Sequence, residues 1–403
     1  MSGEFRERGS GATRRASLAA LVAAVATALA ACSSSSSYFS GFTSSAPGGP
    51  AQPAATLGSG QVKAALILPI SAPGNAGIAG QAMRNAADMA LAEFNAPNIQ
   101  LLVKDDAGSA DGARQAAQQA LNEGAEIILG PLFAQSVTAV GQVARARNVP
   151  VIAFSTDANV ASPGVYLLSF LPETDVQRIV QYSSSVGKRS YAALIPDNPY
   201  GTVVEAAFRQ DVSRHGGRIV ALERYPHDKA AMAGPIKSVA GAAAHAEALF
   251  LPDGSDAVPD VVQQLAGDGV NLKRLQLLGT GLWGDDPRIN ATPALDGGWY
   301  AAPDPAGYRN FASRYAARFK QQPVRTATLA YDAVALIAAL VKTQGAQRFT
   351  PEILTNPSGF SGIDGLFRFR TDGTSERGLA VLRVTKSGPQ TVAPAPRSFG
   401  ASG

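Results

Sequence analysis

From Val62 onward the chain alternates short apolar runs with longer amphipathic stretches, and this alternation limits the folds that it can form. Runs rich in Ile, Leu and Val, such as 63–70 and 99–104, have the length of buried strands. The segments 76–95 and 110–123 place alanine and other apolar residues at helical spacing. Strands that alternate with helices indicate βαβ units and parallel sheets covered on both faces.

The same alternation starts a second cycle after residue 176, which predicts two α/β lobes with the chain passing between them more than once. Further strands are predicted at 126–129, 150–154, 189–195, 218–223, 246–251 and 275–278, after which residues 297–302 cross to a new segment. Further helices are predicted at 135–147, 176–185, 200–215, 231–244, 258–266, 306–320 and 326–345.

A hairpin is predicted near the C-terminus. The apolar runs 366–370 and 378–384 flank Thr371-Asp-Gly-Thr374, and Asp372-Gly373 is a favoured dipeptide for a tight turn between antiparallel strands. We therefore expect these two runs to pair with each other.

The N-terminus carries the features of a secretory signal. Arg14 and Arg15 precede uncharged residues 16–31, which are mostly Ala, Leu and Val and too few to span a membrane comfortably. The run ends in Leu-Ala-Ala-Cys32, which resembles a bacterial lipobox, where the Cys is lipidated and becomes the mature N-terminus. The alternative is a signal peptide with an incidental Cys. We expect a signal peptide at 1–31 and a lipid anchor on Cys32.

Composition limits the partners and cofactors. Removal of residues 1–31 takes away four Arg and two Glu, so the formal charge falls from +4 to +2, which gives little reason to expect nucleic-acid binding. Cys32 is the only cysteine, and the three histidines lack metal-ligand spacing, so we expect no cofactor and no metal. The Ser/Pro/Gly-rich stretch 32–60 predicts a flexible tether, and 387–403 a flexible tail.

Enzyme motifs are incomplete. Gly359-Phe-Ser-Gly362 falls short of a nucleophile elbow, and Tyr182 stands where a phosphate loop ending at Gly187-Lys188 requires glycine. Asp105-Asp106 suggests an acid pair or a metal site, but adjacent carboxylates at a strand end are more often solvated or cap the next turn. We expect a protein that is not an enzyme.

An ordered set of motifs resembles the leucine-binding-protein family, the type I periplasmic binding proteins. These motifs are Leu66-Ile-Leu-Pro-Ile-Ser71 with Gly74, Gly77 and Gly80, Val103-Lys-Asp-Asp-Ala107, Ile128-Leu-Gly-Pro131, Pro150-Val-Ile-Ala-Phe-Ser-Thr156 and Asp197-Asn-Pro-Tyr-Gly201. The resemblance implies two Rossmann-like lobes with parallel sheets, joined by three crossovers, with a ligand cleft between them. It implies a first lobe of 61–172 plus 303–348 and a second of 173–302 plus 349–386.

The resemblance also implies site residues. In the family, the positions matching Ser136, Ser155, Thr156 and Tyr200 hold an amino-acid ligand, and Ser71 ends the first motif at the same strand edge. Helix N-termini at such edges offer N–H groups suited to a carboxylate. The plainer interpretation is that Ser136 caps a helix and that Ser155-Thr156 form an ordinary strand-end turn.

One departure from the family concerns the ligand ammonium. Amino-acid-binding members carry an acidic residue in the segment matching Leu278–Trp283, where this chain has Gly281. A buried ammonium without a counter-charge is costly. Asp253 and Asp285 are the candidate substitutes, although neither lies in the matching segment. Trp283 is a candidate to line the cleft or a protein interface, and equally a candidate for simple packing.

A narrower resemblance is to the lipoproteins named penicillin-binding protein activators. It rests on Phe133-Ala-Gln-Ser136, Val151–Asp157, Leu277–Trp283, Gly297–Asp304 and Gly362–Phe369. It implies contact with a peptidoglycan synthase in the periplasm. Ser33 replaces the Asp associated with inner-membrane retention, which implies an outer-membrane location. The alternative is a solute receptor that delivers an amino-acid-like ligand to an ABC permease, with hinge closure of the lobes.

Overall fold

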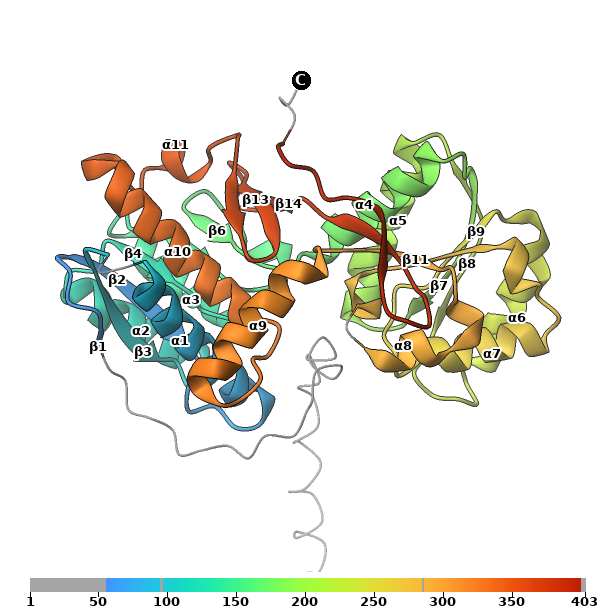
Figure 1. Ribbon diagram of the computed structural model, residues 1–403, viewed down its shortest axis with the longest axis horizontal. Helices are drawn as coiled ribbons and strands as arrows, with labels where there is room; N and C mark the ends of the chain where they lie inside the picture. Colours follow the sequence, from blue (N-terminus) through green and yellow to red (C-terminus); the bar gives the residue numbers. More distant parts are fainter. Residues whose placement is uncertain (1–55, 95–96, 285, 400–403) are drawn as a thin grey trace, which may run out of the picture. The chain divides into compact units, whose positions relative to one another are not determined.

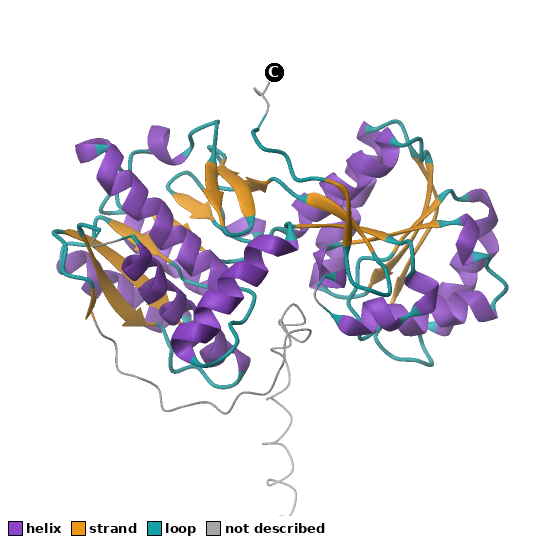
Figure 2. Ribbon diagram, viewed as in Figure 1, coloured by secondary structure: helices purple, strands orange, loops and turns teal. Residues whose placement is uncertain are grey.

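The computed structural model describes residues 56–94, 97–284 and 286–399. The predicted signal peptide, Cys32 and most of the predicted tether lie outside the described residues, as does Asp285. The described chain forms two α/β lobes, each built on a large sheet dominated by parallel strands, together with a small antiparallel sheet (Figures 1 and 2). The predicted fold class is therefore confirmed.

The first lobe contains a six-stranded sheet in the order β1-β3-β2-β4-β5-β6. All its neighbouring strands run parallel except β1 and β3. The central strands are buried on both faces, which explains their unbroken apolar runs. The strands are β1 (Thr56–Leu57), β2 (Val62–Leu68), β3 (Ile99–Asp105), β4 (Ile127–Leu129), β5 (Val151–Ala153) and β6 (Val165–Leu167).

Helices cover both faces of this sheet. One face packs against α2 (Ala110–Asn122) and α3 (Ala134–Arg145). The other packs against α1 (Asn75–Glu93) and α10 (Ala327–Thr343), beside which α9 (Pro305–Phe319) lies (Figure 1). The side chains of these helices that face the sheet are largely alanine, so the helices can lie close to it.

The second lobe contains a seven-stranded sheet in the order β16-β15-β11-β10-β9-β7-β8. Helices α4 (Pro172–Ser185) and α5 (Pro199–Arg214) cover one face, and α6 (Ala233–Ala242), α7 (Val258–Gly267) and α8 (Pro287–Ala291) cover the other. The strands are β7 (Ser190–Pro196), β8 (Arg218–Tyr225), β9 (Ala248–Phe250), β10 (Gln276–Gly279), β11 (Trp299–Ala302), β15 (Ala380–Arg383) and β16 (Gln390–Ala393).

Short elements complete the described chain. The small sheet joins β12 (Phe360–Gly362), β13 (Gly365–Phe369) and β14 (Ser375–Arg377), and α11 (Pro351–Leu354) precedes it. The single-turn 3₁₀ helices are η2 (Ala158–Val160), η3 (Ala243–His245), η4 (Leu272–Arg274), η5 (Gly281–Trp283), η6 (Pro293–Leu295) and η7 (Gly345–Gln347).

The predicted C-terminal hairpin has the right turn but the wrong second strand. Asp372-Gly373 does connect antiparallel strands, yet β13 pairs with the short β14. The run 378–384 instead contains β15, which pairs with β11 in the second lobe. Gly378 and Leu379 therefore carry the chain out of the hairpin and into the large sheet. Residues expected in a flexible tail include β16, which pairs with β15.

The hairpin turn lies against the first lobe at Gly373. Gly373 has φ +88°, and a Cβ placed on it would lie 2.2 Å from the Val165 carbonyl oxygen and 2.6 Å from that of Ser162. Its own carbonyl accepts a hydrogen bond of 2.8 Å from the Leu167 N–H. Glycine is therefore required here both for its backbone conformation and for the close approach of β6.

We expect Gly373→Ala to destabilise the protein more than Gly388→Ala. Gly388 also has positive φ, at +106°, but a Cβ there would meet nothing within 4 Å. Backbone strain of about 1–2 kcal/mol applies to both variants, and only Gly373→Ala adds the clash. Urea unfolding of both variants measures the difference. Equal losses of unfolding free energy would show that the turn does not depend on its contact with β6.

Candidate functional site

Each large sheet presents the carboxyl ends of its parallel strands at one edge, and open α/β sheets bind ligands there. We call the loops that follow β2 to β5 the first edge, and the loops that follow β7 to β10 the second edge. Apart from Trp283, all the predicted ligand residues within the described chain lie at one of these two edges or beside it.

Ser71 and Ser136 belong to the first edge. Ser71 is exposed, and its backbone N–H donates to the Asp105 carboxylate at 3.2 Å. Ser136 is fully buried in the first turn of α3, and its hydroxyl donates to the Ser109 carbonyl at 3.3 Å. The residue that precedes α3 is Phe133, so Ser136 is not the helix cap that the plainer interpretation expected. Its hydroxyl links α3 to the loop that begins α2.

Ser155 and Thr156 follow β5 at the same edge. The Ser155 hydroxyl accepts a hydrogen bond of 3.1 Å from the Asp157 N–H, which closes a local turn. Thr156 is partly buried beside it. The strand-end turn expected by the plainer interpretation is thus present, and it holds the Ser155 hydroxyl oxygen.

Asp106 is a further polar group of the first edge. The side chain is fully buried, and its Oδ1 accepts from the Gly108 N–H at 2.8 Å. Its Oδ2 has no hydrogen-bond partner among the described residues. Burial, together with repulsion from Asp105, raises the pKa of Asp106 to about 6, although the Gly108 N–H opposes this.

At the second edge, Tyr200 and Thr280 share a hydrogen bond of 2.9 Å between their hydroxyls. Tyr200 is in the first turn of α5, and Thr280 is fully buried after β10. Burial is the main reason that the pKa of Tyr200 lies well above its usual value, and the carboxylates of Asp175, Asp253 and Glu173 add to the rise. Tyr200 therefore interacts with three acidic groups.

Asp253 is held by neighbouring side chains. Its Oδ2 accepts from the Tyr225 hydroxyl at 2.5 Å and faces His227 Nε2 at 2.6 Å, while its Oδ1 accepts from the Gly254 N–H. The hydrogen bond to Asp253 raises the pKa of His227. These contacts occupy both carboxylate oxygens, which weakens the case that Asp253 is the missing ammonium partner.

A different carboxylate lies where the family resemblance expects one. The Gly281 N–H donates to Asp175 Oδ2 at 2.9 Å, and a Cβ placed on Gly281 would lie 3.0 Å from the same oxygen. Asp175, in the first turn of α4, therefore occupies the space next to position 281. Burial raises the pKa of Asp175 to about 7, against the effects of the Gly281 N–H and Arg377.

Trp283 does not line the second edge. It is 1% exposed and belongs to the core beneath α6 and α7, with its ring 6.3 Å from that of Tyr300. Gly279 and Gly298 leave room for the indole, since a Cβ on either would lie within 3.0 Å of the ring. The structure thus favours the packing interpretation of Trp283 over contact with a ligand.

Sequence reasoning missed Asp175, Tyr225 and His227. Asp175 is one of two acidic residues in the first turn of a helix that begins with proline, which is an ordinary helix-start pattern. Tyr225 is the last residue of the edge strand β8, whose sequence carries no motif, and His227 lies just beyond it. Only the pairing of β7, β8 and β9 brings these residues to Asp253.

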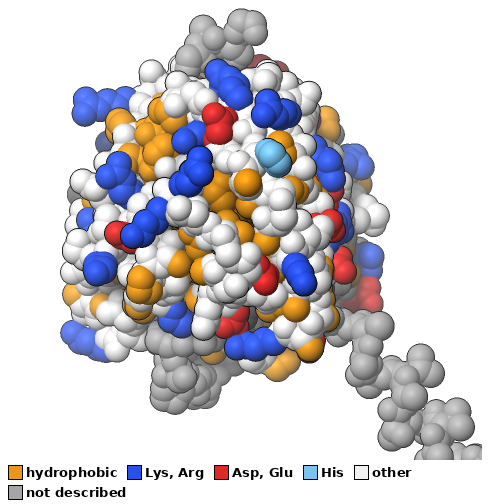
Figure 3. Space-filling model, turned by 90° about the vertical axis from the view of Figure 1, so that its right-hand side faces the viewer, with side chains coloured by type: hydrophobic (Ala, Val, Ile, Leu, Met, Phe, Trp, Pro, Cys, Tyr) orange, Lys and Arg blue, Asp and Glu red, His pale blue; other side chains and the backbone are white. Residues whose placement is uncertain are grey.

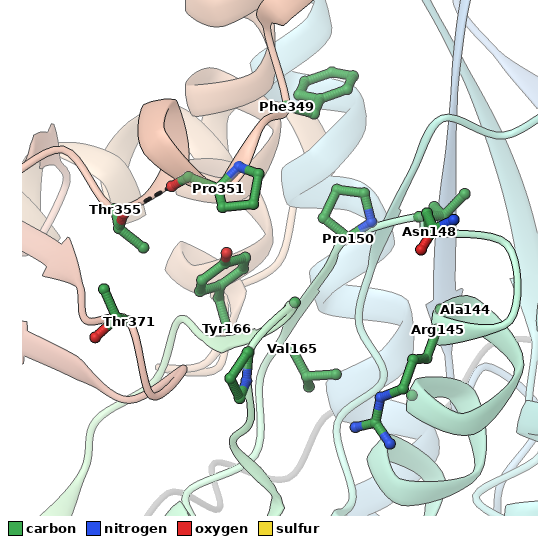
Figure 4. Close-up of a pocket in the computed structure, with 14 residues that line it drawn as sticks. Ala144, Arg145, Asn148, Pro150, Val165, Tyr166, Phe349, Pro351, Thr355 and Thr371 are labelled. Carbon is green, nitrogen blue, oxygen red and sulfur yellow. Dashed lines mark hydrogen bonds between the residues drawn. The ribbon is translucent and has the colours of Figure 1, made fainter.

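A cavity of about 430 Å³ lies elsewhere in the first lobe, near the amino ends of β5 and β6. Tyr166, Pro351 and Thr355 lie on one side of it, and Arg145 and Asn148 on the other (Figure 4). Its lining includes none of the predicted ligand residues. The cavity is therefore separate from the first edge.

The described residues contain no group of three or more His, Cys, Asp or Glu side chains placed to hold a metal ion. None of their helices combines the length and the apolar character needed to cross a bilayer. On the face of the second lobe shown in Figure 3, Lys and Arg side chains are spread among acidic and hydrophobic ones.

We expect Asp106→Asn to stabilise the protein more at pH 8 than at pH 4.5. Because the pKa of Asp106 is raised to about 6 in the folded state, the wild type loses stability as pH rises through the window from 3.8 to 6. The variant cannot ionise and keeps that stability. The gain between the two pH values is on the order of 1–3 kcal/mol, measured by urea unfolding.

The control for this prediction is Asp111→Asn, because Asp111 is exposed in the first turn of α2. Its pH dependence of stability is expected to follow the wild type. A pH-independent difference between Asp106→Asn and the wild type would contradict the raised pKa.

Comparison with known families agrees with this geometry. A family model described as periplasmic binding protein matches residues 61–389, which span both lobes. A putative branched-chain amino acid ABC transporter protein from Rhodospirillum rubrum has a similar structure, with a TM-score of 0.72, 20% identity, and coverage of 82% of this chain and 99% of that one.

Two more solved structures share the fold. The leucine binding protein LivK from Thermotoga maritima has a TM-score of 0.57 at 18% identity, over 82% of this chain and 98% of that one. A solute binding protein from Rhodopseudomonas palustris BisB5, in complex with 3,4-dihydroxy benzoic acid, has a TM-score of 0.60 at 21% identity, over 84% and 97%. At these identities the likeness shows the fold alone.

A curated protein also matches part of the chain. The penicillin-binding protein activator LpoA of Pantoea ananatis is 29% identical over 131 residues, which are 32% of this chain and 19% of that protein. The match therefore spans about a fifth of the length of that relative. The family match over residues 61–389 and the two-lobed fold together identify the family. The chain belongs to the periplasmic binding protein family.

Proposed function

We propose that this chain is a non-enzymatic, lipid-anchored periplasmic protein that regulates a peptidoglycan synthase by direct contact, as a penicillin-binding protein activator. The partial sequence match to LpoA supports this role. The proposal rests mainly on one observation. Polar side chains that the family resemblance assigns to an amino-acid ligand already form hydrogen bonds with other residues of the chain.

These internal hydrogen bonds occur at both the first edge and the second edge. Ser136 donates to Ser109, and the Ser155 oxygen accepts from the Asp157 N–H. At the second edge, Asp253 is held by Tyr225 and by His227. A ligand would have to replace these hydrogen bonds, which lowers the net gain from binding. A protein that contacts its partner through its outer surface does not have to break these hydrogen bonds.

We expect the purified chain to increase glycan polymerisation or cross-linking by the peptidoglycan synthase of the same organism. The physical reason is that contact between two folded surfaces stabilises one conformation of the synthase. The measurement is the rate of product formation from lipid-linked precursor, with and without the chain. Its heat-denatured form is the control, and an unchanged synthase rate with direct binding also absent would contradict the proposal.

A second function, solute reception for an ABC permease, is favoured by one observation. Asp175 places a carboxylate beside Gly281, where amino-acid-binding members have an acidic group. Under this function, Ser136→Ala combined with Thr156→Ala abolishes ligand binding while the fold survives. Under the proposed function, the same pair of substitutions leaves synthase stimulation intact.

The lipid anchor is proposed on the sequence Leu-Ala-Ala-Cys32, and the outer membrane on Ser33. We expect Cys32→Ala to move the protein from the membrane fraction to the soluble periplasmic fraction, because the acyl chains supply its membrane affinity. Cell fractionation followed by immunoblotting measures this. Cys32→Ala protein that stays in the membrane fraction would contradict a lipid anchor at this residue.

A further inference from the structure

The chain passes between the two large sheets three times. It crosses after β6 at Ser169–Leu171, after β11 at residues 303–304, and after β14 at Gly378–Leu379. Any change in how the lobes are related must bend these crossings. The residues that hold the crossings therefore control that change.

Phe170, on the first crossing, is in contact with two guanidinium groups. The Cζ of Arg325, which precedes α10, lies 4.8 Å from the centre of the Phe170 ring, and the Cζ of Arg377, at the end of β14, lies 4.7 Å from it. Arg377 Nε also donates to the Ser169 carbonyl at 2.8 Å. Arg377 thus ties the third crossing to the first.

The two arginines differ in their carboxylate partners. Both terminal nitrogens of Arg325 donate to the two oxygens of Asp364, which also accepts from the Thr328 hydroxyl at 2.6 Å. Arg377 is 5% exposed, and its Nη1 and Nη2 have no hydrogen-bond partner within the described ranges. A buried cation in this state is costly.

A buried acidic group beside the Arg325–Asp364 pair also has one oxygen without a partner among the described residues. Asp332 on α10 is 2% exposed, its Oδ1 accepts from the Ile363 N–H at 2.8 Å, and its Oδ2 has no partner among the residues that the structure describes. The charge of Arg377 lowers the pKa of Asp332, while burial and Asp364 raise it, to about 7. The charges of Arg377 and Asp332 therefore interact electrostatically, although no hydrogen bond joins the two side chains.

Arg377 also interacts electrostatically with a carboxylate of the second lobe. Its charge lowers the pKa of Asp175, which lies beside Gly281 at the second edge and near Glu173. The charge of Arg377 thus interacts with the charges of Asp364 and Asp332 in the first lobe and of Asp175 in the second. A shift of the third crossing would move the guanidinium relative to these three carboxylates.

We propose that Arg377 and Asp332 form an electrostatic latch at the crossings: a direct ion pair between them stabilises a second arrangement of the two lobes. In the arrangement described here the latch is open. The latch goes beyond the proposed function, because it requires neither a solute nor a synthase. Its test can therefore fail while the proposed function holds.

The test measures the distance between the lobes by double electron–electron resonance. Spin labels are attached to Gln118→Cys on α2 and Gln210→Cys on α5, both exposed, in the full chain carrying Cys32→Ser so that no other thiol is present. The measurement is made at pH 8, where Asp332, with a pKa of about 7, is charged. We expect two distance populations in this background.

Asp332→Asn keeps the shape of the side chain and the acceptor for the Ile363 N–H but removes the charge. We expect it to change the ratio of the two populations by about tenfold, because a charged buried hydrogen bond is worth that order in an equilibrium. Arg377→Met is expected to give the same shift, and the double variant no more than either single one. Arg370→Met, on the same hairpin and paired with the partly exposed Glu376, is the control that keeps the original ratio.

A single distance population in the background chain would overturn the latch. So would an unchanged ratio in Asp332→Asn, or shifts of the two single variants that simply add. If Arg377→Met does not fold, Asp332→Asn alone still decides, because its side chain has nearly the same volume as the original.

Discussion

The ion pair between Arg325 and Asp364 is the interaction on which the arrangement of the crossings depends. The Asp364 side chain is fully buried and that of Arg325 is 13% exposed. Two charges taken out of water are tolerated only with good geometry and further hydrogen bonds, and removal of one partner leaves the other uncompensated. Here the geometry is bidentate and Thr328 adds a third hydrogen bond. The pair therefore fixes the start of α10 relative to the β12–β13 turn and holds Phe170 beside it.

This cluster connects to the strand edges through Arg377 and Asp175. Because Asp175 accepts from the Gly281 N–H, the charge at the crossings reaches the edge where the family binds its ligands. At the same time, the predicted ligand groups Ser136, Ser155 and Asp253 have partners inside the chain. Under the proposed function, these polar groups contribute to internal stability, and contact with another protein takes place through the outer surface.

Much of the fold follows from local patterns, because apolar runs and helical spacing depend on near neighbours in sequence. Most strands and helices of both lobes lie within a few residues of their predicted positions, but β1, β6, β11, β16 and α8 were not predicted. The failure at 378–384 has a physical cause: a turn dipeptide specifies that the chain reverses, not how long the returning strand stays paired. The Gly378 N–H still donates to the Leu366 carbonyl of β13, and only the apolar run after it pairs with β11.

The candidate site was less predictable. The resemblance located Ser136, Ser155, Thr156 and Tyr200 at strand edges, but hydrogen-bond partners distant in sequence decide what these groups do. Asp175 reaches Gly281 across 106 residues, and His227 meets Asp253 only because β8 and β9 flank the same strand. Trp283 was named as a candidate to line the cleft because it lies in a segment that resembles the family. Its indole instead packs in the hydrophobic core. Residue type alone does not distinguish these cases.

The central claim is that a periplasmic binding protein fold here works by protein contact and not by amino-acid uptake. The most direct test is isothermal titration calorimetry of the chain from residue 33 onward, refolded to remove any bound solute, against the twenty amino acids in pools. The account predicts no heat of binding and no shift in melting temperature. Micromolar or tighter binding of any amino acid would contradict it and identify the chain as an uptake receptor.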